Sequence, residues 1–244
     1  MYKVCHLDQS LAKKKPRIKI FFLPHPFFIF AAIMAWMLFF VLPNKIMAMP
    51  LNELIAQAQD RYEKTGDVKA DFIQEATIKS MNKTEREEGV FYFKNPRRMV
   101  WDYTKPKKKK LVINPQTAWL YIPEDSIVYV QDAESILKSK VSIRFLAGLG
   151  KLKNDFHIAF AGPDHVDREG NFLLKLVPKE RDFGMEELFL ALDKEKLQIT
   201  RLSFTDGYGN TTRLFFRNIN VNNNLPEKFF TFIPPAGVEV YHNR

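Results

Sequence analysis

From Val68 onward the sequence alternates between apolar and polar residues, and this alternation recurs in short stretches almost to the end of the chain. In the first stretch every second residue belongs to a mostly apolar set: Val68, Ala70, Phe72, Gln74, Ala76 and Ile78. Successive side chains of a β-strand point to opposite faces, so a period of two indicates a strand with one buried face. We therefore predict a chain built mainly of half-buried strands.

Further short strands follow, separated by turn residues. They are predicted at 89–94, 98–104, 111–113, 118–122, 127–131, 155–160, 172–177, 187–192, 199–205 and 211–218. The segment Asp206–Asn210 (DGYGN) between the last two suits a hairpin connection. A long run of short strands is typical of an antiparallel sandwich or barrel.

Helical spacing appears at two places in the chain. An amphipathic helix over 50–64, ended by Gly66, is predicted from Leu51, Leu54, Ile55, Ala58 and Tyr62. Segments 133–138 and 142–150 have helical composition and fall between two groups of strands. Helices inserted in this way can cover the open face of a sheet. We expect a curved sheet with one N-terminal helix and a central helical insertion.

Residues 1–48 differ from the rest of the chain. A basic beginning is followed by an uncharged apolar run from Phe27 to Leu42. This order is typical of a signal peptide, and we expect cleavage after Ala48, export to the periplasm, and one domain over 49–244. A retained membrane anchor is the alternative. A helix that spans a membrane needs about 20 apolar residues. The run from Phe27 is shorter, and Pro24 and Pro26 disfavour its extension as a helix toward the N-terminus.

The formal charge of +9 is concentrated in this leader. Residues 1–48 hold seven of the 37 Lys and Arg residues and one of the 28 acidic residues, so the remainder carries +3. Nucleic-acid binding is therefore not expected. The single cysteine, Cys5, precedes the apolar run, so the remainder has neither a disulfide framework nor a thiol for lipid attachment.

The sequence carries no motif that indicates an enzyme. It contains neither GxSxG nor HExxH, and no histidine of 49–244 has a second one at metal-binding spacing. We expect no catalysis, no cofactor and no metal. The basic run Lys105–Lys110 is interpreted as a solvated loop, with contact to acidic lipid head groups or an acidic protein as the alternative.

Four short motifs occur in a fixed order along the predicted strands. They are ADFIQ at 70–74, GVFYFKNP at 89–96 with Trp101-Asp102-Tyr103 and Pro106, LVPK at 176–179, and DGYGNTT at 206–212 followed by FFTFIPPAGVEV at 229–240. In number, order and spacing they resemble the LolA-like family of outer-membrane lipoprotein carriers. The likeness extends from about Leu51 to Val240.

This resemblance implies an incomplete, strongly curved antiparallel β-barrel with helices that form a lid over its open face. It implies that acyl chains of lipoproteins are carried between the membranes. The implied partners are acylated lipoproteins, an inner-membrane lipoprotein-releasing ABC transporter and an outer-membrane lipoprotein acceptor. Nothing in the sequence indicates a stable oligomer, so a monomer is expected. An anchored envelope sensor or scaffold domain of the same fold, binding a protein partner, is the competing hypothesis.

Candidate site residues follow from the predicted strands and helices. The acyl-chain cavity is assigned to Phe72, Phe91, Phe93, Met99, Trp101, Trp119 and Tyr121. The apolar face of the lid is assigned to Leu54, Ile55, Ala58, Phe145, Leu146 and Leu149. The family often has Arg at the position of Asn95 as a latch for the lid, so this role falls to Asn95 itself or to Arg97 or Arg98.

Overall fold

The computed structural model describes residues 49–139, 141–147, 152–180 and 184–242. They belong to one compact unit, Met49–Arg244. The predicted signal peptide and its cleavage after Ala48 lie outside the described residues. Among those residues, no helix is both long and apolar enough to cross a membrane.

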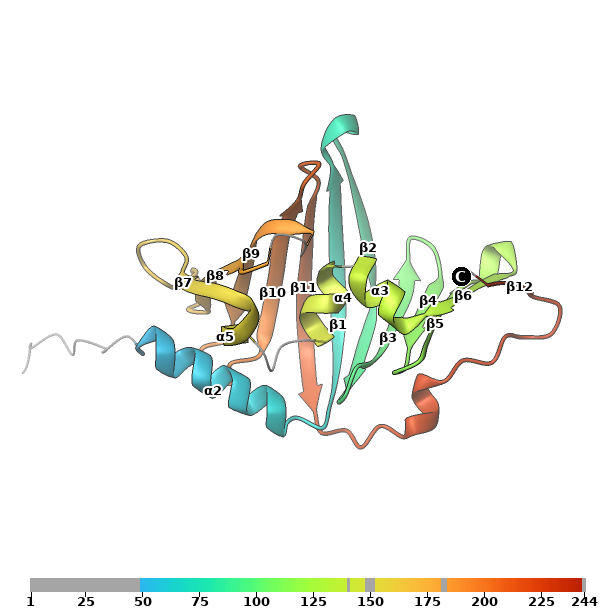
Figure 1. The fold of residues 1–244 in the computed structure, drawn as a ribbon, viewed down its shortest axis with the longest axis horizontal. Helices are drawn as coiled ribbons and strands as arrows, with labels where there is room; N and C mark the ends of the chain where they lie inside the picture. Colours follow the sequence, from blue (N-terminus) through green and yellow to red (C-terminus); the bar gives the residue numbers. More distant parts are fainter. Residues whose placement is uncertain (1–48, 140, 148–151, 181–183, 243–244) are drawn as a thin grey trace, which may run out of the picture. The chain divides into compact units, whose positions relative to one another are not determined.

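Twelve strands form a single sheet in the order β12-β6-β5-β4-β3-β2-β1-β11-β10-β9-β8-β7. Their bounds are β1 Asp67–Ile78, β2 Lys83–Lys94, β3 Arg98–Lys105, β4 Lys109–Ile113, β5 Thr117–Ile122, β6 Ile127–Asp132, β7 Phe156–Phe160, β8 Phe172–Pro178, β9 Met185–Leu192, β10 Ile199–Asp206, β11 Thr211–Val221 and β12 Glu239–His242. All neighbours are antiparallel except β12 and β6. The sheet curls strongly without closing, which confirms the predicted incomplete barrel (Figure 1).

The predicted alternation decides which face of the sheet is buried. In β1, Ala70 and Phe72 are buried whereas the neighbouring Lys69 and Asp71 are exposed. We call the face that carries Phe72 the inner face. It holds the main hydrophobic core, and Leu174, Leu188, Leu202 and Leu214 bring strands β8 to β11 into it.

Helices lie in front of the sheet in the view of Figure 1. They are α2 Leu51–Lys64, α3 Ala133–Ser139, α4 Val141–Ala147 and α5 Leu152–Asp155, with short 3₁₀ turns η1 Lys79–Met81, η2 Pro123–Asp125 and η5 Glu227–Phe230. Leu54 of α2, Phe145 of α4 and Leu152 of α5 belong to the main core. The helices therefore cover the inner face, as the sequence predicted.

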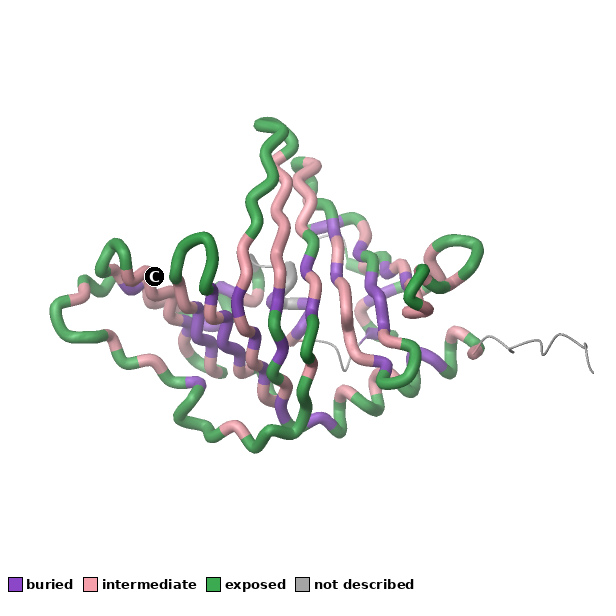
Figure 2. The backbone as a smooth tube through the Cα atoms, turned by 180° about the vertical axis from the view of Figure 1, so that it is seen from behind, coloured by how far each residue is buried: buried purple, intermediate pink, exposed green. Residues whose placement is uncertain are grey.

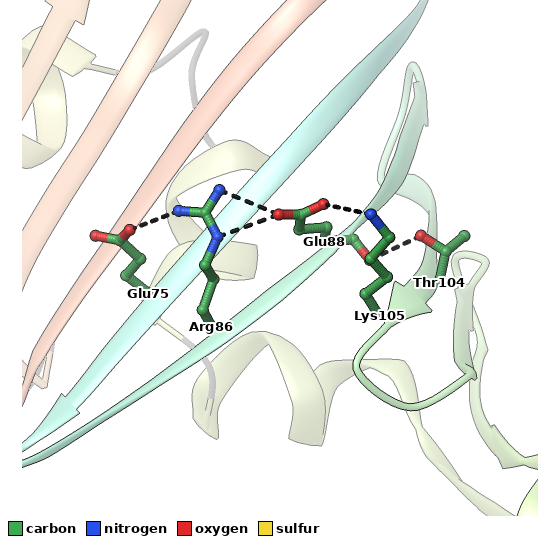
Figure 3. A network of polar contacts seen from close by, with 5 residues as sticks. All are labelled: Glu75, Arg86, Glu88, Thr104 and Lys105. Carbon is green, nitrogen blue, oxygen red and sulfur yellow. Dashed lines mark hydrogen bonds and ion pairs between the residues drawn. The ribbon is translucent and has the colours of Figure 1, made fainter.

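Polar side chains cover the outer face over parts of β1, β2 and β3. Arg86 of β2 lies between two carboxylates: one guanidinium nitrogen is 2.9 Å from Glu75 and another is 3.1 Å from Glu88 (Figure 3). Glu88 also accepts from Lys105, and its carbonyl accepts from Thr104. These side chains are half-buried or exposed, so solvent screens each pair and it stabilises the fold little. Their charges make this part of the outer face hydrophilic. Figure 2 shows this face from behind, with the central strands coloured mainly as exposed or intermediate.

Part of the outer face is covered by the C-terminal segment, residues 222–242. Phe230 is fully buried there in a second core with Val100 and Val112, against which Trp119 and Phe232 pack. The segment ends in β12, which pairs with β6 and forms one edge of the sheet. The sequence did not predict this strand, because its four residues pair in parallel with residues more than a hundred positions away.

The beginning of this segment is anchored by a buried carboxylate. Asp67 is 3% exposed, and it accepts backbone N–H bonds from Asn223 at 2.6 Å and Leu225 at 2.9 Å. Burial raises the pKa of Asp67, but these hydrogen bonds outweigh it and hold the pKa below its ordinary value. Lys94 adds a bond of 2.6 Å to the Leu225 carbonyl. The segment is thus fixed at the start of β1.

Candidate functional site

Four aromatic rings from four neighbouring strands meet on the inner face: Phe72 of β1, Phe91 of β2, Trp101 of β3 and Phe216 of β11. The ring centroid of Trp101 lies 4.5 Å from that of Phe91, 5.0 Å from Phe72 and 6.3 Å from Phe216. These distances fall within the usual range of favourable aromatic pairs. We refer to these four residues as the aromatic cluster.

A small cavity of about 110 Å³ lies on one side of the aromatic cluster. Phe91 and Phe216 line it, together with Ala58 and Tyr62 of α2 and Leu146 of α4. Most of the remaining wall is aliphatic and comes from β1, α5 and the region of β9 to β11, while Arg61, Thr65 and Gln198 contribute its polar atoms. We call this space the apolar cavity; such a wall stabilises a hydrocarbon chain that would otherwise be in water.

A larger cavity of about 860 Å³ lies on the other side of the cluster. Trp101 lines it, and its wall also contains charged residues, among them Lys109, Lys138 and Glu186. The Lys109 ammonium is 2.5 Å from the Glu87 carboxylate. We call this space the mixed cavity, because its wall suits both an apolar and a polar part of a ligand.

Five of the seven predicted cavity residues belong to the main core, but only three line a cavity. Phe91 and Phe93 line the apolar cavity, and Trp101 lines the mixed one. Phe72 and Met99 are buried in the core beside them.

Trp119 and Tyr121 were assigned to the wrong face. Trp119 packs against the second core, and the Tyr121 ring lies 5.3 Å from that of Phe232 in the C-terminal segment. Because side chains alternate along β5, the inner-face residues are Ala118 and Leu120 instead. Both faces of β5 carry apolar side chains, so the sequence pattern alone did not distinguish them.

The lid residues are placed in the helices that cover the inner face. Leu54, Phe145 and Leu146 are buried in the main core, and Ala58 packs against it. Ile55 is also buried, at 3% exposure. Leu149 lies outside the described residues. Five of the six residues are thus packed beneath or within the helical layer.

The three candidate latch residues contact three different elements. The Asn95 side chain donates to the Thr65 carbonyl at 3.0 Å, where α2 ends. Arg97 lies 3.8 Å from Glu134 of α3, in an exposed ion pair. Arg98 is 2.6 Å from Glu227 and so contacts the C-terminal segment rather than the helices. Asn95 and Arg97 are therefore the two that reach the helical layer.

A contact between two lid helices was not predicted. The Tyr62 hydroxyl of α2 donates to the Leu146 carbonyl of α4 at 3.1 Å, and the Tyr62 ring stacks on Phe93 with centroids 5.5 Å apart. Burial raises the pKa of Tyr62, so the hydroxyl remains a donor at neutral pH. Its apolar position on α2 was visible in the sequence, but its partner on α4 was not.

Sequence reasoning also missed the C-terminal half of the apolar cavity. Its wall includes Leu190, Leu192, Ile199, Phe216, Ile219 and Val221. Strands β9, β10 and β11 follow β1 in the sheet order, which brings these residues opposite Phe91. The segments 187–192, 199–205 and 211–218 were predicted as strands, but no residue of them was assigned to the cavity, because their strand neighbours were unknown.

The basic run Lys105–Lys110 is largely neutralised by carboxylates on nearby strands and turns. Ion pairs join Lys107 to Glu124 at 3.2 Å and Lys110 to Asp102 at 2.9 Å. Lys105 ends β3, and Lys109 and Lys110 begin β4, so only residues 106–108 form the loop that was predicted for the whole run. Across the described parts of the chain, no three His, Cys, Asp or Glu side chains are grouped in a way that could hold a metal ion.

Comparison with known proteins agrees with the family suggested by the motifs. The family described as "Outer membrane lipoprotein carrier protein LolA" matches residues 63–233. An outer-membrane lipoprotein carrier protein of Methylococcus capsulatus is 31% identical over 177 residues, which are 72% of this chain and 82% of that protein. The corresponding protein of Dechloromonas aromatica is 28% identical over 186 residues, 76% of this chain and 86% of its own.

A solved structure shows the same fold at low sequence identity. The crystal structure of an uncharacterized conserved protein from Thermus thermophilus superimposes with a TM-score of 0.51 and 16% identity, over 77% of this chain and 98% of the other. The family match covers most of the described unit, including the strands that form both cavities. The chain belongs to the LolA family of outer-membrane lipoprotein carrier proteins.

Proposed function

We propose that this protein is a periplasmic carrier that binds the acyl chains of lipoproteins on the inner face of its sheet and shuttles them from the inner to the outer membrane. The observation that carries the proposal is the apolar cavity between the sheet and α2. Lipoprotein binding also agrees with the names of the curated relatives. The proposed partners are a releasing transporter in the inner membrane and an acceptor in the outer membrane.

The physical task explains the architecture. Each methylene removed from water contributes about 0.8 kcal/mol, so two or more chains hold a protein firmly on a membrane. A carrier must offset part of that free energy without binding so tightly that release fails. Leu54 and Leu146 of the lid are buried in the main core, and Ala58 packs against it. A chain must displace them, so the net affinity is the difference between two burial free energies.

The carrier function is tested on protein purified from the cell envelope. Native mass spectrometry is expected to find a bound lipoprotein or diacyl lipid, and the empty protein is expected to release lipoproteins from inner-membrane vesicles. Protein that is always empty and releases nothing contradicts the proposal. The N-terminal residue of the same sample distinguishes a freely diffusing carrier from a tethered domain.

A pair of variants on α2 tests the apolar cavity itself. Ala58 lines the cavity and Ala56 is exposed on the same helix. Ala58→Phe is expected to fill the space and lower lipid loading at least tenfold, whereas Ala56→Phe leaves loading unchanged. Circular dichroism of both variants checks the fold. Equal loading of the two folded variants contradicts the assignment of this cavity to the acyl chain.

A further inference from the structure

The indole N–H of Trp101 has no acceptor. Among the side chains that the structure describes, it is the only buried nitrogen or oxygen without a hydrogen-bond partner. The residue itself is 2% exposed. An unsatisfied buried donor is unfavourable, and a phenylalanine ring would fill an aromatic core without this penalty. The N–H is therefore a buried donor whose hydrogen-bonding capacity no protein group meets.

Trp101 stands at the boundary between the two cavities. It lines the mixed cavity, while its ring contacts Phe91 and Phe216, which line the apolar cavity. A ligand that occupies both cavities must pass the aromatic cluster. The part of the ligand at that point lies beside the Trp101 ring.

The two cavities match the two ends of an acyl lipid, which has an apolar tail and a polar head group. The apolar cavity suits a hydrocarbon tail, and the mixed cavity, with Lys109, Lys138 and Glu186, suits a polar head. In an acyl lipid the group between tail and head is an ester or amide carbonyl. A carbonyl oxygen is an acceptor, and the indole nitrogen is a donor only.

We propose that Trp101 forms a carbonyl subsite, in which its indole N–H donates a hydrogen bond to the ester or amide carbonyl of a bound acyl chain. The tail then lies in the apolar cavity and the head in the mixed cavity. This inference rests on the proposed carrier function and adds to it the orientation of the ligand. It also requires that the ligand displace one of the neighbouring rings, because the indole nitrogen is buried.

The subsite is tested with two lipids that differ only at the carbonyl. A monoacylglycerol has an ester carbonyl, and a 1-O-alkylglycerol of equal chain length has a methylene in its place. Dissociation constants are measured for both with the unit Met49–Arg244, which contains every described strand and both cores. The protein is expected to prefer the ester by roughly three- to tenfold, the effect of one net hydrogen bond.

Two tryptophan variants separate the hydrogen bond from general packing. Trp101→Phe keeps an aromatic ring and is expected to bind both lipids equally. Trp119→Phe removes an indole N–H from the outer face and is expected to keep the preference for the ester. A preference that persists in Trp101→Phe overturns the subsite, as does equal binding of both lipids by the unchanged protein.

A spectroscopic measurement gives the same answer in the unchanged protein, even where Trp101→Phe does not fold. The indole proton resonance of Trp101 is expected to move downfield with the ester lipid and not with the ether lipid. An identical response to both overturns the subsite alone. Failure of both lipids to bind at all contradicts the carrier function as well, so the two proposals fail in distinguishable ways.

Discussion

At the scale of single residues, Gly89 explains why one motif position tolerates no side chain. A methyl group added there would lie 2.1 Å from the Asp102 carbonyl oxygen and 2.9 Å from the Phe72 ring. We predict that Gly89→Ala lowers the free energy of unfolding by at least about 1–3 kcal/mol, the usual effect of overpacking. Urea unfolding measures this. Gly207→Ala, with open space around it, is the control and should change stability by less than about 0.5 kcal/mol.

Asp67 makes stability depend on acidity. Its pKa is held below the ordinary value by the N–H groups of Asn223 and Leu225. The ionised Asp67 carboxylate therefore contributes fully to the free energy of unfolding above the unfolded-state pKa of about 3.9. This contribution is lost as the pH falls through the lower folded-state pKa. Asp67→Asn should lower stability at neutral pH by about 1.5–3 kcal/mol and should flatten the decline in acid. Urea unfolding from neutral to acidic pH checks both, and an unchanged acid decline contradicts the assignment.

At the scale of elements, the contact between α2 and α4 sets how readily the lid opens. Tyr62→Phe keeps the ring on Phe93 but removes the hydrogen bond to the Leu146 carbonyl. Because a ligand must displace lid contacts, the variant should bind acyl lipid about two- to tenfold more tightly and unfold slightly more easily. Titration of lipid into both proteins measures the change. Tyr121→Phe on the outer face is the matched control, and a lower affinity of Tyr62→Phe contradicts this role.

Elements were predictable from the sequence to different degrees. The strand pattern and α2 were visible because one face of each meets water, so that polarity alternates at the period of the element. The alternation did not distinguish the two faces of β5, because Trp119 packs against the second core and Leu120 against the main core. A strand that is apolar on both faces contains no signal for which face is inner. The missing information is the position of Phe230, more than a hundred residues away.

At the scale of the whole unit, the sheet separates two tasks. The inner face carries both cavities, whereas Phe230 fills the second core on the outer face. Phe230→Ala should therefore lower the free energy of unfolding by about 3–5 kcal/mol while the affinity of the remaining folded protein for lipid stays the same. Thermal unfolding and lipid titration are measured on one sample. A parallel loss of affinity shows that the two faces are coupled.

Only part of each cavity wall could be predicted from the sequence, for a reason of connectivity. Phe91 and Trp101 come from neighbouring predicted strands and were among the residues assigned to the acyl-chain cavity. Phe216 was not, because β11 reaches them only through its pairing with β1. A cavity is lined by residues from distant parts of the chain, and its volume depends on how they pack together. The spacing of residues in the sequence gives neither.

The pairing of β1 has a consequence for the time course of folding. β1 meets β2 across a short turn, but β11 is synthesised more than 130 residues later. Until then the central strand has one unpaired side, and the apolar interior lacks half of its wall. Such non-local pairing slows folding and prolongs exposure to other chains. The free edge of β1 and the incomplete apolar interior are therefore the parts of the nascent chain most open to misassociation until β11 has emerged.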